Sequence, residues 1–93
     1  MKEIRIKDSD LSYDGLSGFR TNIMSILLST EEDVTLNFKD ISLSLDSSAI
    51  GDLMKFHEAM HKRGKKLLIK DINKLIRTVF SLNKLDTILH ILD

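Results

Sequence analysis

The residues whose types and spacing could carry chemistry lie in one short segment, Asp46-Ser47-Ser48-Ala49-Ile50-Gly51. The segment opens a stretch with helical periodicity, so we expect both serine hydroxyls in the first turn of a helix. The N–H groups of a first turn have no partner within the helix, and the dipole is positive there. Such a position accommodates a phosphate group. The alternative is that Asp46, Ser47 and Ser48 simply cap the helix, and residue chemistry alone favours capping.

A second candidate is the run His57-Glu58-Ala59-Met60-His61, which matches the H-E-x-x-H pattern of zinc peptidases. The two histidines are one helical turn apart, which is the spacing of a zinc-binding pair. No later His or Glu is evidently placed as a third ligand, and the basic Lys62 and Arg63 follow directly. Two solvated histidines near a helix C-terminus, where the dipole favours positive charge, explain the run better. We therefore predict no metal site.

Other enzyme signatures are absent from the sequence. The chain has no P-loop, no GxGxxG loop and no G-x-S-x-G elbow. It also has no cysteine, which excludes disulfides, thiolate nucleophiles and thiolate metal ligands. The sequence therefore predicts a protein that is not an enzyme and needs no cofactor.

Charge and hydropathy limit the partners. The 93 residues include 14 basic and 14 acidic side chains, so the formal net charge is zero. Nucleic-acid binding depends on surplus Lys and Arg that neutralise phosphates, and there is no such surplus. No segment approaches the roughly 20 apolar residues of a membrane span, and the first residues do not resemble a signal peptide. We expect a cytoplasmic protein that neither binds nucleic acid nor inserts into a membrane.

Periodicity predicts the elements that position these residues. Alternating apolar and polar side chains are typical of half-buried strands, and apolar residues three or four apart are typical of helices. The predicted strands are Lys2–Lys7, Val34–Phe38, Lys65–Lys70 and Thr87–Leu92. The predicted helices run over about 14–29, from Asp46 or Ser47 to Arg63, and from Asp71 to Leu82. This alternation predicts one α/β domain over residues 1–93, with a largely parallel four-stranded sheet and helices mainly on one face.

Individual side chains can be assigned as well. Asp71 is the predicted N-cap of the third helix, and Gly64 is the predicted C-terminal cap of the second. The strand residues predicted to enter the core are Ile4, Ile6, Val34, Leu36 and Phe38. The predicted buried face of the third helix comprises Ile72, Leu75, Ile76, Val79 and Leu82.

The order of these segments resembles the STAS domain family, named for sulphate transporters and anti-sigma factor antagonists. In that family a strand ends in a D-S-S/T-G-like turn and enters a helix, as Leu45–Gly51 does here. The other segments that carry the resemblance are Asn37–Ser42, Arg63–Ile69 and Asn73–Leu85. Two differences from the family pattern are Ala49, where glycine is common, and one additional residue in Leu43–Leu45.

The resemblance implies a function like that of bacterial anti-sigma factor antagonists. The second serine of the motif, here Ser48, is then phosphorylated by a partner that is both an anti-sigma factor and a serine kinase. The unphosphorylated form binds that partner, and a phosphatase reverses the modification. The partner-binding residues implied here are Asp46, Ser47, Ser48, Ala49 and Asp52.

Two other functions remain open from the sequence. One is a STAS adaptor that is never phosphorylated, such as a subunit of a transporter or of a signalling assembly. The other is a small-ligand or nucleotide-binding protein that uses the same helix N-terminus as an anion site.

Overall fold

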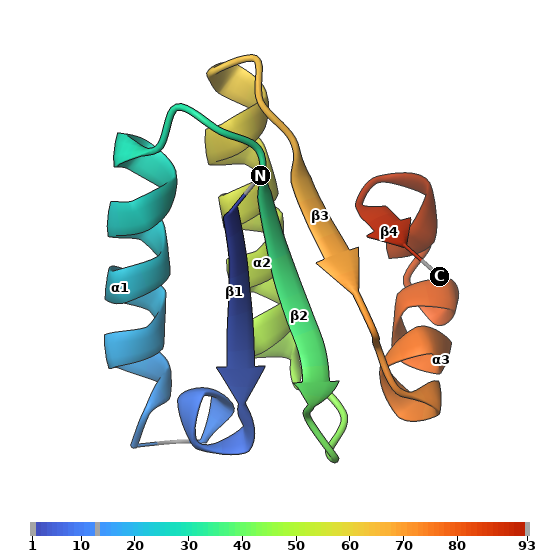
Figure 1. The fold of residues 1–93 in the computed structure, drawn as a ribbon. Coiled ribbons are helices and arrows are strands. Elements are labelled where there is room, and N and C mark those ends of the chain that lie inside the picture. Colours follow the sequence, from blue (N-terminus) through green and yellow to red (C-terminus); the bar gives the residue numbers. More distant parts are fainter. Residues whose placement is uncertain (1, 13, 93) are drawn as a thin grey trace.

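The structure is a computed structural model that describes residues 2–12 and 14–92. Strands and helices alternate along the described chain (Figure 1). In order, the elements are β1 (Lys2–Lys7), η1 (Asp8–Leu11), α1 (Leu16–Ser29), β2 (Val34–Asp40), α2 (Ser47–Lys62), β3 (Leu67–Lys70), α3 (Lys74–Leu82), η2 (Leu85–Thr87) and β4 (His90–Leu92). The described chain thus contains each predicted strand and helix, with differences at several ends.

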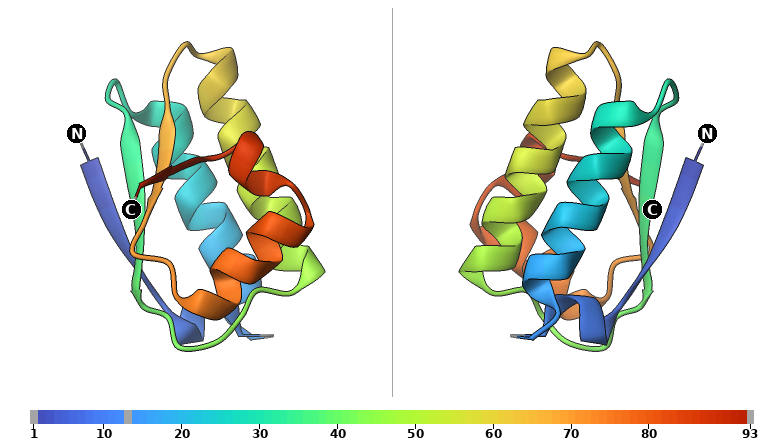
Figure 2. Two further views of the ribbon diagram at one scale, coloured as in Figure 1. Left: turned by 90° about the vertical axis from the view of Figure 1, so that its right-hand side faces the viewer. Right: turned by 90° about the vertical axis from the view of Figure 1, so that its left-hand side faces the viewer.

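The described strands form one parallel sheet in the order β1-β2-β3-β4. Leu36 of β2 pairs with Ile4 of β1 on one side and with Ile69 of β3 on the other. Each strand lies beside the strand that precedes it in the sequence, so the sheet grows toward one side only. Because the crossovers are right-handed, every connecting helix then lies on the same face of the sheet. Figure 2 shows α1, α2 and α3 on one side of the sheet. The predicted parallel sheet with helices mainly on one face is confirmed.

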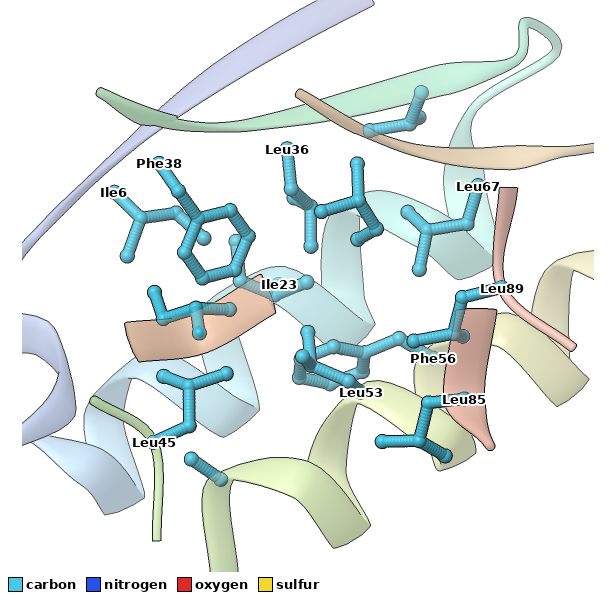
Figure 3. Packing of buried hydrophobic residues seen from close by; sticks show 14 of the residues in the cluster. Ile6, Ile23, Leu36, Phe38, Leu45, Leu53, Phe56, Leu67, Leu85 and Leu89 are labelled. Carbon is cyan, nitrogen blue, oxygen red and sulfur yellow. The ribbon is translucent and has the colours of Figure 1, made fainter. Parts of the chain in front are cut away.

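The hydrophobic core fills the layer between the sheet and the helices (Figure 3). Val34, Leu36 and Phe38, which alternate along β2, are buried in it as predicted. Ile6 of β1 is also buried, whereas Ile4 is only partly buried. The buried residues that α1 and α2 add to this core are Phe19, Ile23, Leu27, Ala49, Leu53, Phe56 and Met60.

The opposite face of the sheet is polar. Asn37 of β2 is buried, and its Nδ2 donates a hydrogen bond of 3.2 Å to Oε2 of Glu3. Its Oδ1 accepts from the backbone N–H of Lys39 at 2.8 Å. Lys70 Nζ lies 3.7 Å from Oε1 of the same Glu3. Side chains of neighbouring strands therefore cover the polar centre of this face, where no described helix lies.

The prediction that Asp71 caps the third helix is wrong. Asp71 has a positive φ of 58°, whereas an N-cap residue has extended backbone like that of Asn73. The Asn73 side chain accepts a hydrogen bond from Ile76 N–H at 2.8 Å, and α3 begins at the next residue. Its Nδ2 donates to the carbonyl oxygens of Ile41 and Leu43, at 2.9 and 3.1 Å. A contact with the distant β2–α2 loop therefore holds the residue that starts this helix.

The predicted buried face of the third helix is partly wrong. Ile76 and Phe80 are buried and Val79 is partly buried, but Leu75 and Leu82 are 56% and 78% exposed. The apolar residues of α3 share one wide face, and the sequence alone does not show which part of that face is covered. The position of the helix beside β3 and β4 decides which side is buried.

The last strand is shorter than predicted. Of the described residues, His90–Leu92 pairs with β3, because the 3-10 turn η2 takes up Leu85–Thr87. Lys84, with a φ of 58°, starts that turn, and Leu89 enters the core after it. The remaining differences are at element ends: α1 begins at Leu16, β2 ends at Asp40, α2 ends at Lys62 and β3 begins at Leu67. Gly64 follows α2 with a φ of 70°, as the predicted C-terminal cap requires.

Candidate functional site

The candidate site is the first turn of α2, and Asp46 fixes where it begins. Asp46 has extended backbone, and its Oδ1 accepts a hydrogen bond of 2.9 Å from Ala49 N–H. The N–H of Ile50 donates to the backbone carbonyl of Asp46 at 3.0 Å. Asp46 is therefore the N-cap, and Ser47 and Ser48 are the first two residues of the helix.

Both serine side chains of this turn are exposed. Neither hydroxyl makes a hydrogen bond with any described residue, because the capping bond comes from Asp46 alone. The capping alternative therefore accounts for Asp46 and leaves Ser47 and Ser48 without a structural role. Two accessible hydroxyls remain at the positive end of a 16-residue helix.

Two residues of the implied partner-binding set are not on the surface. Ala49 is 4% exposed and Asp52 is 3% exposed, because both lie on the side of α2 that faces the rest of the domain. A partner that docks on this face cannot touch them directly. The accessible residues of the set are Asp46, Ser47 and Ser48.

The carboxylate of Asp52 is paired with Arg20 of α1. Arg20 Nε donates a hydrogen bond of 2.8 Å to Oδ1 of Asp52, and this bond and the negative charge raise the pKa of the Arg20 guanidinium. The other oxygen, Oδ2, is buried and accepts no hydrogen bond from the described residues. Sequence reasoning missed Arg20 because nothing in its local pattern distinguishes it from other exposed helix residues.

A groove of about 410 Å³ runs along the seam between α1 and α2. Phe19 and Phe56 meet below this seam, edge to face, with ring centroids 5.9 Å apart. Arg20 lines the groove and also contacts Asp52, so it connects the groove with the second turn of α2. The residues that line the groove are Arg20, Thr21, Met24, Ser25, Lys55 and Phe56.

The loop that leads into α2 is held at two points. Ser42 donates its hydroxyl to Asp8 Oδ2 at 2.8 Å and its N–H to Asp8 Oδ1 at 3.1 Å. On the other side, Asn73 binds the carbonyls of Ile41 and Leu43. These contacts fix the approach to the site and leave the side chain of Leu43 62% exposed.

The three histidines approach one another at a different place. The His57 ring lies 5.9 Å from the ring of His61 and 5.9 Å from that of His90, measured between centroids. Burial lowers the pKa of His57, and the neighbouring His90 and His61 lower it further, whereas Glu58 acts in the opposite direction. Within the described part of the chain, no three His, Asp or Glu side chains are arranged to hold a metal ion. The absence of tight zinc binding stays a prediction.

Comparisons with known proteins place this geometry in a known fold. No family model and no curated protein matches the sequence. The structure, however, superimposes with a TM-score of 0.83 on the crystal structure of a Thermotoga maritima protein provisionally assigned as an anti-sigma factor antagonist. The match covers 98% of this chain and 79% of that one, at 20% sequence identity. The chain has the fold of an anti-sigma factor antagonist.

The resemblance inferred from the segments around Ser48 is thus confirmed at the level of the fold. In this fold, the β2–α2 connection and the first turn of α2 lie at the carboxyl end of a parallel strand. None of the described helices is both long enough and apolar enough to span a bilayer.

Proposed function

We propose that this chain is a cytoplasmic, non-catalytic antagonist of an anti-sigma factor, and that phosphorylation of Ser48 switches it off. The observation that carries the proposal is the pair of exposed serine hydroxyls at the start of α2, free of capping bonds, on the fold of an antagonist. The neutral hydroxyl surface binds an anti-sigma factor that is also a serine kinase, which releases the sigma factor. A phosphatase returns the modified chain to its active form.

The proposed modification is a phosphoryl transfer from ATP. The Ser48 hydroxyl oxygen forms a bond to the γ-phosphorus as the bond between that phosphorus and the β–γ bridging oxygen breaks. ADP leaves, and the hydroxyl proton passes to a base of the kinase. The product carries about −1.5 to −2 additional charges at pH 7.

The added charge explains why the partner would dissociate. The surface next to Ser48 already contains the exposed carboxylate of Asp46. A partner surface that fits a neutral hydroxyl would meet a cluster of negative charge and lose the water shell of the phosphate without compensation. The fold itself need not change, because a helix N-terminus tolerates an anion.

Ser48 is proposed over Ser47 because the second serine of the motif is the acceptor in the STAS resemblance. The structure does not separate the two, since neither hydroxyl makes a hydrogen bond with a described residue. Incubation with ATP and a candidate anti-sigma factor kinase, followed by peptide mass spectrometry, tests the choice. Phosphate should appear on Ser48 and disappear in Ser48→Ala, while Ser47→Ala should be phosphorylated normally.

Binding measurements test the switch. Ser48→Ala should keep its affinity for the kinase partner, and Ser48→Asp should weaken it, with Ser47→Asp as the matched control. Phosphate on Ser47, or an unchanged affinity of Ser48→Asp, would contradict the proposal. Stable binding that does not respond to ATP would favour an adaptor instead. Thermal stabilisation by nucleotide alone would favour a ligand-binding protein.

A further inference from the structure

Arg20 of α1 lies close to the start of α2, and the role proposed for it below rests on the proposed phosphorylation of Ser48. Ser48 and Asp52 stand one helical turn apart on α2, a spacing that places Cβ atoms about 5–6 Å from each other. Asp52 in turn holds the Arg20 guanidinium through the 2.8 Å bond to Nε. The Arg20 guanidinium, which comes from α1, therefore binds α2 at Asp52, one helical turn after Ser48.

Most of the donors of Arg20 are unused. A guanidinium has five N–H donors in a planar fork, and only Nε–H is engaged by a described residue. The side chain is 46% exposed, whereas the Asp52 side chain that anchors it is 4% exposed. The terminal N–H groups of Arg20 are thus available to a second anion while the Nε bond keeps the group in place.

Asp52 cannot easily give up this partner. Its carboxylate is buried, Oδ2 accepts no hydrogen bond from the described residues, and Arg20 is its ion-pair partner among those residues. A buried carboxylate without compensation is strongly unfavourable. An anion added beside Asp52 would therefore be tolerated best if Arg20 bound both groups at once.

We propose that Arg20 is the internal counter-ion of a phosphate on Ser48 and bridges that phosphate to Asp52. Arginine is suited to this role because its planar fork binds phosphate through two parallel hydrogen bonds. Phosphorylation would then change the surface twice. It adds an anion at Ser48, and it occupies the outward donors of Arg20 that an acidic group of the partner could otherwise bind.

Helix geometry makes the role specific for Ser48. With about 100° of rotation per residue, Ser48 is about 40° around the helix from Asp52, and Ser47 is about 140° away. A phosphate on Ser47 would share the helix N-terminus but would point away from Arg20. Position 47 is therefore a matched control for the effect of the helix end alone.

The test uses the full chain with phosphoserine installed genetically at position 48 or 47, so that no kinase is needed. The second phosphate pKa, near 6 for a free phosphoserine, is measured by ³¹P NMR titration. We expect it to be at least about half a unit lower at position 48 than at position 47, because an adjacent cation favours the doubly charged form. Arg20→Gln should remove this difference.

Arg20→Gln leaves the Asp52 carboxylate buried without a partner and could unfold the domain. The double variant Arg20→Gln/Asp52→Asn is neutral and nearly isosteric, and the single variant Asp52→Asn retains Arg20. The phosphate at position 48 should keep its low pKa in Asp52→Asn and lose it in the double variant. Equal values in these two proteins would overturn the role of Arg20. The titration needs no kinase, so it tests the role of Arg20 alone. Failure of a kinase to modify Ser48 would instead contradict the proposed function.

Discussion

The imidazole of His57 on α2 lies 5.9 Å from that of His90 on β4, ring centroid to ring centroid, and the two planes are inclined by 54°. The His61 ring lies at the same distance from the His57 ring and is nearly parallel to it. His57 is thus the middle member of three imidazoles that cannot all become charged without mutual repulsion. This arrangement links α2 to the terminal strand of the sheet.

Stability should therefore depend on pH through His57. Its pKa in the folded state is lowered from the ordinary 6.5, first by burial and then by His90 and His61. The unfolded chain consequently binds more protons in this range, and stability falls as the pH decreases. The loss should begin as the pH falls through 6.5 and end below the lowered folded pKa. Urea unfolding at several pH values between 8 and 5, with NMR titration of the ring protons, measures both quantities.

His90→Gln is the control for this pH dependence. It removes one neighbouring positive charge, so the pKa of His57 should rise toward 6.5, although burial keeps it below that value. His57→Gln should flatten the pH dependence of stability over the same range. A His57 resonance that titrates above 6.5 in the folded protein would contradict this account.

Leu36→Ala should destabilise the domain by about 2–5 kcal/mol, the usual cost of truncating a buried leucine. Leu36 is completely buried at the centre of β2, between β1 and β3. Denaturant unfolding gives the difference in free energy. The matched control is Leu82→Ala, since Leu82 is 78% exposed at the end of α3 and should change stability by less than about 0.5 kcal/mol. A small effect at Leu36 would mean that this register of β2 is incorrect.

Asn73→Ala should cost about 0.5–2 kcal/mol through the lost cap of α3. The substitution also removes the side-chain bonds to the carbonyls of Ile41 and Leu43, so the β2–α2 loop should exchange its amide protons faster. Urea unfolding and hydrogen exchange measure the two effects. Asp71→Gly is the comparison, because glycine adopts the positive φ of this position freely and no cap is lost. If Asp71→Gly costs more than Asn73→Ala, the assignment of the cap is wrong.

Zinc should not bind tightly. His57, Glu58 and His61 satisfy the H-E-x-x-H spacing, but the described residues do not surround a common point with three ligands. Calorimetric titration of the metal-free protein with Zn²⁺ should show no tight one-to-one complex, and peptide hydrolysis should be absent. Tight binding that is lost in His61→Ala, or in His90→Ala, would show that the rings rotate into a site.

Local sequence determined the parts of this protein that depend on neighbours along the chain. Alternating side chains at Val34, Leu36 and Phe38 define one buried face of a strand, because successive side chains of a strand point to opposite sides. Asp46 caps α2 and Gly64 ends it through interactions within a few residues. The order of strands and helices, together with the handedness of crossovers, then led to a parallel sheet with its helices on one face.

Tertiary contacts decided the features that connect distant segments. Asp52 looks like one more acidic residue near Ser48, yet it is buried because α1 packs over it and Arg20 neutralises it. Asn73 displaces Asp71 as the cap of α3 because its amide also binds the β2–α2 loop. Periodicity records which residues share a side of an element, but it contains no information on which other element will cover that side. Burial of Asp52, its pairing with Arg20 and the start of α3 therefore emerge only when the helices pack on the sheet.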